Sequence, residues 1–206
     1  MTNPIPIYTI GYGARTLEEL VAVLQTWQIV FLIDIRSAPY SRFKPEFSKE
    51  PLARECQRRH LRYVFMGDVL GGRPVDPTCY TDGKVDYDKV KQTAAYQEGI
   101  ERIRRAFEQQ RRVVLMCSEG RPEACHRSKL IGESLAGLHV PVLHVDENDQ
   151  LLTQDAVIAR LTGGQLTLFG APTFTSRKRY AAADGPREDE ERDTDGLGYD
   201  EDSDGE

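Results

Sequence analysis

The chain has 206 residues, a formal net charge of −6 at pH 7 and 39% hydrophobic residues, which suffices for one ordinary domain with a substantial core. It has no apolar run near the roughly twenty residues that span a membrane, and its first residues lack the charged and apolar regions of a signal peptide. We therefore expect a cytoplasmic protein without membrane partners. In a reducing compartment its four cysteines are expected to be free thiols or ligands rather than disulfides.

The negative charge is concentrated at the C-terminus. Residues 184–206 hold twelve acids against two arginines, a charge of −10, which leaves +4 on residues 1–183. With few apolar residues, this acidic tail cannot bury enough surface to offset chain entropy, and we expect it to be disordered. Its charge either serves solubility or mimics a polyanion that covers a basic site. The folded domain is expected over residues 1–183, with a core over about 5–170.

Strands and helices are predicted to alternate along this domain. Apolar or β-rich runs predict strands, in chain order, at residues 5–10, 30–33, 62–66, 113–116 and 140–145. Helical spacing and capping residues predict helices at 17–26, 50–60, 96–110, 122–138 and 154–161. This order predicts an α/β fold, a single Rossmann-like three-layer domain with a mostly parallel five-stranded sheet.

Two connections are longer than a minimal turn. Residues 35–49 and 67–90 are rich in proline, glycine and aromatic residues. Each leaves the carboxyl end of a predicted strand, the side on which open α/β sheets bind ligands. Loops of this length in a compact domain are commonly functional, so we expect both to contribute to a site.

Polar side chains that directly follow the strands should share one rim of the sheet. The predicted crevice collects Asp34, Arg36, Cys117, Glu119 and Arg127. Isolated buried charges are costly, so several of them in one place indicate a function. A purely structural ion pair between Asp34 and Arg36 remains an alternative.

The densest cluster is the segment CSEGRPEACHR, residues 117–127. Its Pro122 suits the first turn of a helix, which would place Cys125, His126 and Arg127 in the second turn. On that helix Arg127 would lean toward the sheet, while Cys125 and His126 would fall on opposite flanks.

Four interpretations of this cluster remain open. Zinc held by Cys117, Cys125 and His126 is disfavoured, because adjacent helical residues point about 100° apart, and no metal or cofactor is predicted. A phosphatase-like or rhodanese-like Cys117 thiolate is also disfavoured, because Arg127 lies too far along the chain and Glu119 would repel an anion. The third interpretation is a nucleotide or sugar-phosphate site. The fourth is a binding or regulatory module without turnover.

The third interpretation is our leading hypothesis, a hydrolase or transferase acting on a nucleotide or nucleic-acid component. The partner would be a phosphorylated small molecule or a nucleic acid. The predicted residues by role are, as catalytic groups, Asp34, Glu119 and Tyr12; for substrate or phosphate, Arg36, Arg42, Arg127 and His126; and in support, Cys117, Cys125, Gly71 and Gly72.

Several ordered motifs resemble the family named domain of unknown function 488. They are Thr9-Ile10-Gly11, Asp34-Ile35-Arg36, the loop Pro39 to Phe47, Leu70-Gly71-Gly72, Cys117 with Glu119, Cys125-His126-Arg127 and Leu168-Phe169. The resemblance implies the family's fold and site over residues 5–170 but names no activity. The family commonly has histidine where this chain has Tyr12. Tyrosine would keep a hydrogen-bonding role, whereas an obligatory acid-base histidine would imply altered chemistry here.

Overall fold

The computed structural model describes residues 4–164 and 173–180 of the chain, which are built around a six-stranded sheet. The strand order is β3-β2-β6-β1-β7-β8. The strands are β1 (Ile7–Gly11), β2 (Phe31–Asp34), β3 (Arg62–Phe65), β6 (Val113–Cys117), β7 (Val142–Val145) and β8 (Leu151–Thr153). The first five pair in parallel and β8 is antiparallel to β7. The predicted mostly parallel α/β sheet is confirmed, but the count of five strands misses β8, which is only three residues long and exposed at both ends.

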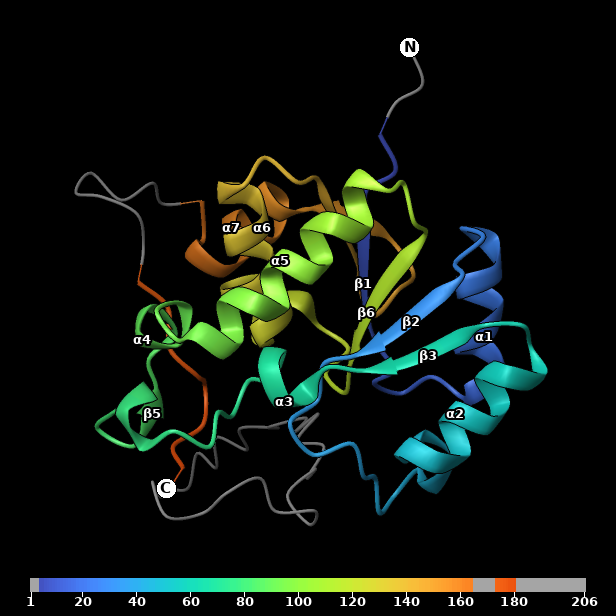
Figure 1. Ribbon diagram of the computed structural model, residues 1–206, viewed down its shortest axis with the longest axis horizontal. Helices are drawn as coiled ribbons and strands as arrows, with labels where there is room; N and C mark the ends of the chain where they lie inside the picture. Colours follow the sequence, from blue (N-terminus) through green and yellow to red (C-terminus); the bar gives the residue numbers. More distant parts are fainter. Residues whose placement is uncertain (1–3, 165–172, 181–206) are drawn as a thin grey trace, which may run out of the picture.

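Helices cover both faces of the sheet, as Figure 1 shows. One face carries α1 (Leu17–Thr26) and α2 (Lys49–Arg58), and the other carries α5 (Ala94–Glu108), α6 (Glu133–Gly137) and α7 (Gln154–Thr162). On the first face Leu24 and Leu52 pack in one apolar cluster with Ile10, and on the second Ile103 packs in another with Leu115. Successive side chains along the parallel strands point to opposite faces of the sheet and thus contribute to two separate apolar cores.

The connection 67–90 is made of short elements rather than an irregular loop. They are α3 (Gly67–Leu70), a 3₁₀ turn (Pro77–Cys79), β4 (Tyr80–Thr81), β5 (Lys84–Val85) and α4 (Tyr87–Lys91). The C-terminal segment 173–180 runs beside β5 and α4 (Figure 1), where Asp86 and Thr175 form an antiparallel bridge. The Ser176 N–H donates to the Val85 carbonyl at 2.9 Å. This segment is therefore docked on the domain by backbone hydrogen bonds.

The predicted helix over residues 122–138 is wrong in its first half. Pro122 starts only a 3₁₀ turn, Cys125 is extended (φ −111°, ψ 154°), and a π-helical segment, Arg127–Gly132, precedes α6. The Ser128 hydroxyl donates to the Pro122 carbonyl at 2.6 Å, and to the Cys125 carbonyl. Side-chain bonds to the backbone of this kind compete with an α-helical ladder. Cys125, His126 and Arg127 consequently do not share a helical turn.

Among the described residues, no helix is both long and apolar enough to cross a membrane. The predicted disordered tail, residues 184–206, and the Leu168-Phe169 pair lie outside the part of the chain that the structure describes.

Candidate functional site

The site lies where the sheet changes the direction of its connections. β1 leads to α1 on one face, whereas the neighbouring β6 leads to α6 on the other, and their last residues, Gly11 and Cys117, are paired. Open α/β sheets bind ligands at such a switch point. The chain after β6 crosses directly over the end of β1, because a Cβ on Gly11 would lie 1.6 Å from the Glu119 carbonyl oxygen. Only glycine permits this approach.

Two cysteines are the centre of the site. Cys117 ends β6 and Cys125 follows the 3₁₀ turn, so that their Sγ atoms are 2.9 Å apart, with both side chains buried. The Cys125 sulfur also lies 3.5 Å from the His126 Nδ1 and accepts the Arg127 N–H at 3.5 Å. The Cys125 sulfur is therefore surrounded by three groups able to donate a hydrogen bond.

The two thiols have opposite electrostatic surroundings. Burial raises the pKa of Cys117, and its hydrogen bond to Cys125 raises it further. Burial also opposes ionisation of Cys125, but the Cys117 thiol and the neighbouring His126 and Arg127 outweigh it and hold the pKa of Cys125 well below its ordinary value. The pKa of His126 is raised, because the Cys125 sulfur beside it overcomes the effect of burial. The arrangement favours a Cys125 thiolate next to an imidazolium.

The imidazole of His126 is held by the Ile35 carbonyl and by close packing against Gly72 of the connection 67–90. The His126 Nε2 is 3.2 Å from the Ile35 carbonyl oxygen, the orientation of a donated hydrogen bond. Its ring lies on Gly72, where a Cβ would come within 2.8 Å of the His126 Cγ, and a Cβ on Gly71 would lie 2.2 Å from the Gly67 carbonyl oxygen. A side chain at Gly72 would therefore push the imidazole away from the sulfur.

Glu119 is the second titrating group at the site. Burial raises its pKa to about 7, with a further contribution from Cys125. Its Oε2 is buried and has no hydrogen-bond partner among the described residues, while Oε1 lies 3.4 Å from the Arg177 guanidinium. A carboxyl group with this pKa can give and take a proton near neutral pH.

Two cations at the site were missed by sequence analysis. Lys129 is buried, which lowers its pKa, and its Nζ donates to the Thr175 carbonyl at 3.4 Å. Arg177 belongs to the segment 173–180 and contacts Glu119. Lys129 lies just two residues beyond Arg127 in the cysteine cluster, which is a signal that sequence analysis could have used, whereas nothing near Arg177 in the sequence links it to Glu119.

Asp34 and Arg36 form a buried pair with each other. The Arg36 Nε and Nη2 donate to the two Asp34 oxygens at 2.9 and 2.7 Å, and the Tyr63 hydroxyl donates to Asp34 at 2.7 Å. Arg36 also donates to the Phe47 carbonyl at 2.7 Å. The Asp34 side chain is 0% exposed and that of Arg36 is 3% exposed. This geometry is that of a bidentate structural ion pair.

The remaining predicted residues lie in different surroundings. The Tyr12 ring is buried and stacks on Phe47, with centroids 4.2 Å apart. Arg127 is fully buried and donates to the carbonyls of Gly120 and Val145, at 2.6 and 2.9 Å. Arg42 is exposed. The structure thus brings Cys117, Glu119, Cys125 and His126 together, engages Arg127 with the backbone beside them, and leaves Arg42 at the surface.

Within residues 4–164 and 173–180, no group of three or more His, Cys, Asp or Glu side chains is arranged to hold a metal ion.

A family model described as domain of unknown function DUF488 matches residues 16–133. The match includes both cysteines of the site and the Asp34-Ile35-Arg36 motif, and it leaves Thr9-Ile10-Gly11 and Leu168-Phe169 outside. No curated protein and no solved structure matches the chain.

Proposed function

Since the chain belongs to the DUF488 family, whose name states no activity, we propose from the site itself that the protein is an enzyme of the hydrolase or transferase class. The observation that supports the proposal is the set of groups around the Cys125 sulfur. The Cys117 sulfur lies 2.9 Å from it, and the His126 Nδ1 and the Arg127 backbone nitrogen each lie 3.5 Å from it. A thiolate in such surroundings is a nucleophile. The nearby Glu119, with a pKa of about 7, supplies proton transfer.

The chemistry needs only these groups and water. The Cys125 thiolate forms a bond to an electrophilic carbon or phosphorus of the substrate, and the leaving group departs with the proton of Glu119. Water, or an acceptor alcohol in a transferase, then attacks the covalent intermediate while Glu119 takes its proton, and the thiolate is released. His126 remains protonated throughout and stabilises the thiolate before its bond to the substrate forms and after that bond breaks.

We propose that substrate reaches the sulfur when the segment 173–180 is displaced. Cys125 is 3% exposed, and this segment contacts the site through Arg177 to Glu119 and through the Thr175 carbonyl to Lys129. Displacing it would free the Glu119 carboxyl for substrate. Lids that open to admit substrate and close to exclude water are common in enzymes.

A nucleotide or nucleic-acid component is the proposed substrate. Support comes from the connection 35–49, where Arg42 lies over the ring of the exposed Phe43, 4.9 Å from its centroid. Aromatic rings and guanidinium planes of this kind stack on bases. The connection borders the site, because the Lys44 Nζ donates to the Gly13 carbonyl at 2.7 Å and the Gly13 N–H donates to the Ser118 carbonyl at 2.9 Å.

The test is a turnover screen with phosphorylated nucleosides and with single-stranded and damaged DNA. It compares wild type, Cys125→Ser, Glu119→Gln and a matched control, Cys56→Ser. Cys56 is a buried thiol of α2, and burial raises its pKa to about 12. We expect the first two variants to lose at least about a hundredfold in turnover and the control to keep its activity. Full turnover by Cys125→Ser would reject the thiolate and leave Glu119 as the reactive group.

The alternative is a non-catalytic nucleotide or nucleic-acid binding module. It is favoured by the burial of the Cys125 sulfur and by the exposure of Arg42 and Phe43. Binding without turnover of any probe, with an affinity that falls steeply as salt rises, would replace the enzyme by this module, because several phosphate contacts release several counterions.

A further inference from the structure

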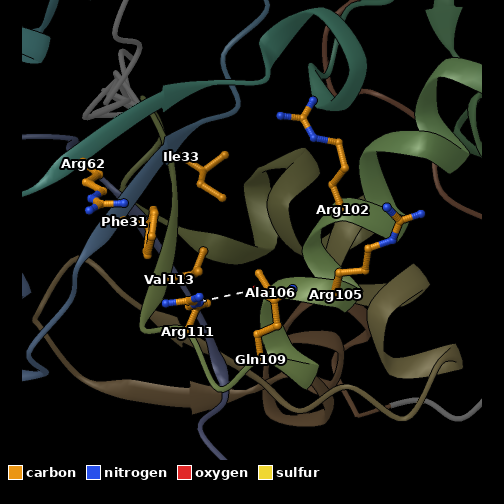
Figure 2. Close-up of a pocket in the computed structure, with 9 residues that line it drawn as sticks. All are labelled: Phe31, Ile33, Arg62, Arg102, Arg105, Ala106, Gln109, Arg111 and Val113. Carbon is orange, nitrogen blue, oxygen red and sulfur yellow. Dashed lines mark hydrogen bonds between the residues drawn. The ribbon is translucent and has the colours of Figure 1, made fainter.

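A groove of about 360 Å³ lies at the amino ends of the strands, on the face covered by α5 (Figure 2). Its sheet side is formed where Phe31 begins β2, with Arg62 of β3 and Val113 of β6 as its register partners. Its other side is formed by the second half of α5 and the residues that follow. β3 is the edge strand of the sheet, and Arg62 at its start is exposed to solvent.

The groove is separate from the cysteine site. Val113 is the first residue of β6 and Cys117 the last. At about 3.3 Å per residue, the two ends of this strand are roughly 13 Å apart. A ligand seated at the amino ends of the strands therefore does not touch the Cys125 sulfur.

Four arginines surround an apolar floor in this groove. Ile33, Ala106 and Val113 form the floor, while the arginines come from β3, from α5 and from the turn before β6: Arg62, Arg102, Arg105 and Arg111. None of the described residues that line the groove is acidic. The lining therefore carries four positive charges above a surface that excludes water from an apolar group.

The protein's own acids neutralise little of this charge. Arg105 contacts Glu101 at 3.3 Å, but Glu101 also pairs with Arg104 at 2.7 Å. Arg111 donates to the neutral Gln109 at 3.4 Å, the dashed line in Figure 2. Arg102 makes no ion pair within 4.0 Å among the described residues. Arg102 and Arg105 are three residues apart on α5, a spacing at which like charges repel each other.

These arginines differ from those at the carboxyl ends of the strands. Arg36 and Arg127 are buried and donate to carboxylate or carbonyl oxygens of the protein. Arg102, Arg105 and Arg111 are exposed. Guanidinium groups that face solvent around a concave surface are well suited to hold phosphate oxygens through paired hydrogen bonds.

We propose that the groove binds a phosphorylated small molecule that also carries an apolar or aromatic part, the chemistry of a nucleoside phosphate. The phosphate groups would contact the arginines, and the ring would cover the floor of Ile33, Ala106 and Val113. The volume of about 360 Å³ lies in the range of small-molecule sites. This site goes beyond the proposed reaction, because none of its residues belongs to the cysteine site.

The experiment is isothermal titration of the full chain at low salt with ADP, adenosine and pyrophosphate as separate probes. The variant is Arg102→Gln, and its matched control is Arg54→Gln, an exposed arginine of α2 on the opposite face of the sheet. Both substitutions remove one exposed positive charge. We expect ADP to bind about tenfold more weakly to Arg102→Gln, the value of one lost charged hydrogen bond, and unchanged to the control.

The following results for ADP, pyrophosphate and an oligonucleotide would overturn the proposal. ADP affinity that is the same in wild type and Arg102→Gln, or no binding at all, would exclude the groove as a phosphate site. Pyrophosphate bound as tightly as ADP would show that the apolar floor contributes nothing. A short single-stranded oligonucleotide bound far more tightly, with a steep salt dependence, would indicate a nucleic-acid surface instead. Cys125→Ser should leave ADP binding unchanged, so this result is independent of whether the proposed enzyme activity exists.

Discussion

Replacing Asp34 by Asn tests whether the buried pair holds the fold or performs chemistry. The Asp34 carboxylate accepts two hydrogen bonds from the Arg36 guanidinium, at 2.9 and 2.7 Å, a third from the Arg36 N–H at 3.1 Å and a fourth from Tyr63. Asparagine keeps the volume but removes the charge. The Arg36 guanidinium, with its side chain 3% exposed, would then remain buried without the Asp34 charge.

The expected cost follows from that burial. Removing one partner of a buried ion pair typically destabilises a protein by about 3–5 kcal/mol, because the other charge stays in a medium of low polarity. With a urea m-value of about 2 kcal/mol/M, this cost lowers the unfolding midpoint by roughly 2 M. Replacing both members by neutral residues, as in Asp34→Asn with Arg36→Met, should recover a large part of the loss, since no unpaired charge remains.

The assay is urea unfolding followed by circular dichroism, with turnover and ligand binding measured on the same samples. Glu108→Gln is the control, because Glu108 pairs with Arg104 and the two side chains are 51% and 37% exposed, and exposed pairs contribute about 0–1 kcal/mol. A stability loss below about 1 kcal/mol in Asp34→Asn, together with loss of turnover, would refute the structural role and restore Asp34 as a catalytic residue.

Two further predictions concern the groups beside the cysteines. The pKa of Glu119 in the folded protein, about 7, lies above its ordinary 4.5, so its contribution to stability is complete below pH 4.5 and is lost as pH rises through 7. In urea unfolding, Glu119→Gln should therefore become more stable relative to wild type as pH rises over that range. A difference in stability that does not change with pH would contradict the burial of the carboxyl group. Gly72→Ala should cost about 1–3 kcal/mol and slow iodoacetamide alkylation of Cys125, because the new Cβ displaces His126. Gly137→Ala, whose Cβ meets nothing within 4 Å, should leave the alkylation rate unchanged.

The sequence by itself determined the architecture. Short apolar runs such as residues 30–33 and 113–116 are typical of strands buried on both faces of a parallel sheet, and the helical periodicity between them predicts the helices that cover it. The same pattern put Cys117 and Glu119 at the carboxyl end of a strand, and the structure has both there. β8 escaped prediction because a three-residue edge strand has no periodicity to detect.

The course of the chain from residue 122 to residue 132 could not be predicted from local pattern. Pro122 and the apolar residues after it fit one helix, yet the Ser128 hydroxyl bonds to two carbonyls and Cys125 is extended. That extended residue brings the Cys125 sulfur to 2.9 Å from Cys117. Cys117 and Cys125 were consequently predicted to have a supporting role, whereas in the structure they lie at the centre of the candidate site.

The use of each arginine was decided only by the tertiary structure. Arg36 and Arg127 were predicted to bind phosphate, and the structure engages both with oxygens of the protein. The exposed arginines gather at the opposite ends of the strands, from residues that are distant in sequence, Arg62, Arg102 and Arg111. Periodicity in a sequence reports which face of an element is apolar. Whether a guanidinium meets a carbonyl of the protein or remains available to a ligand depends on which distant segments pack beside it.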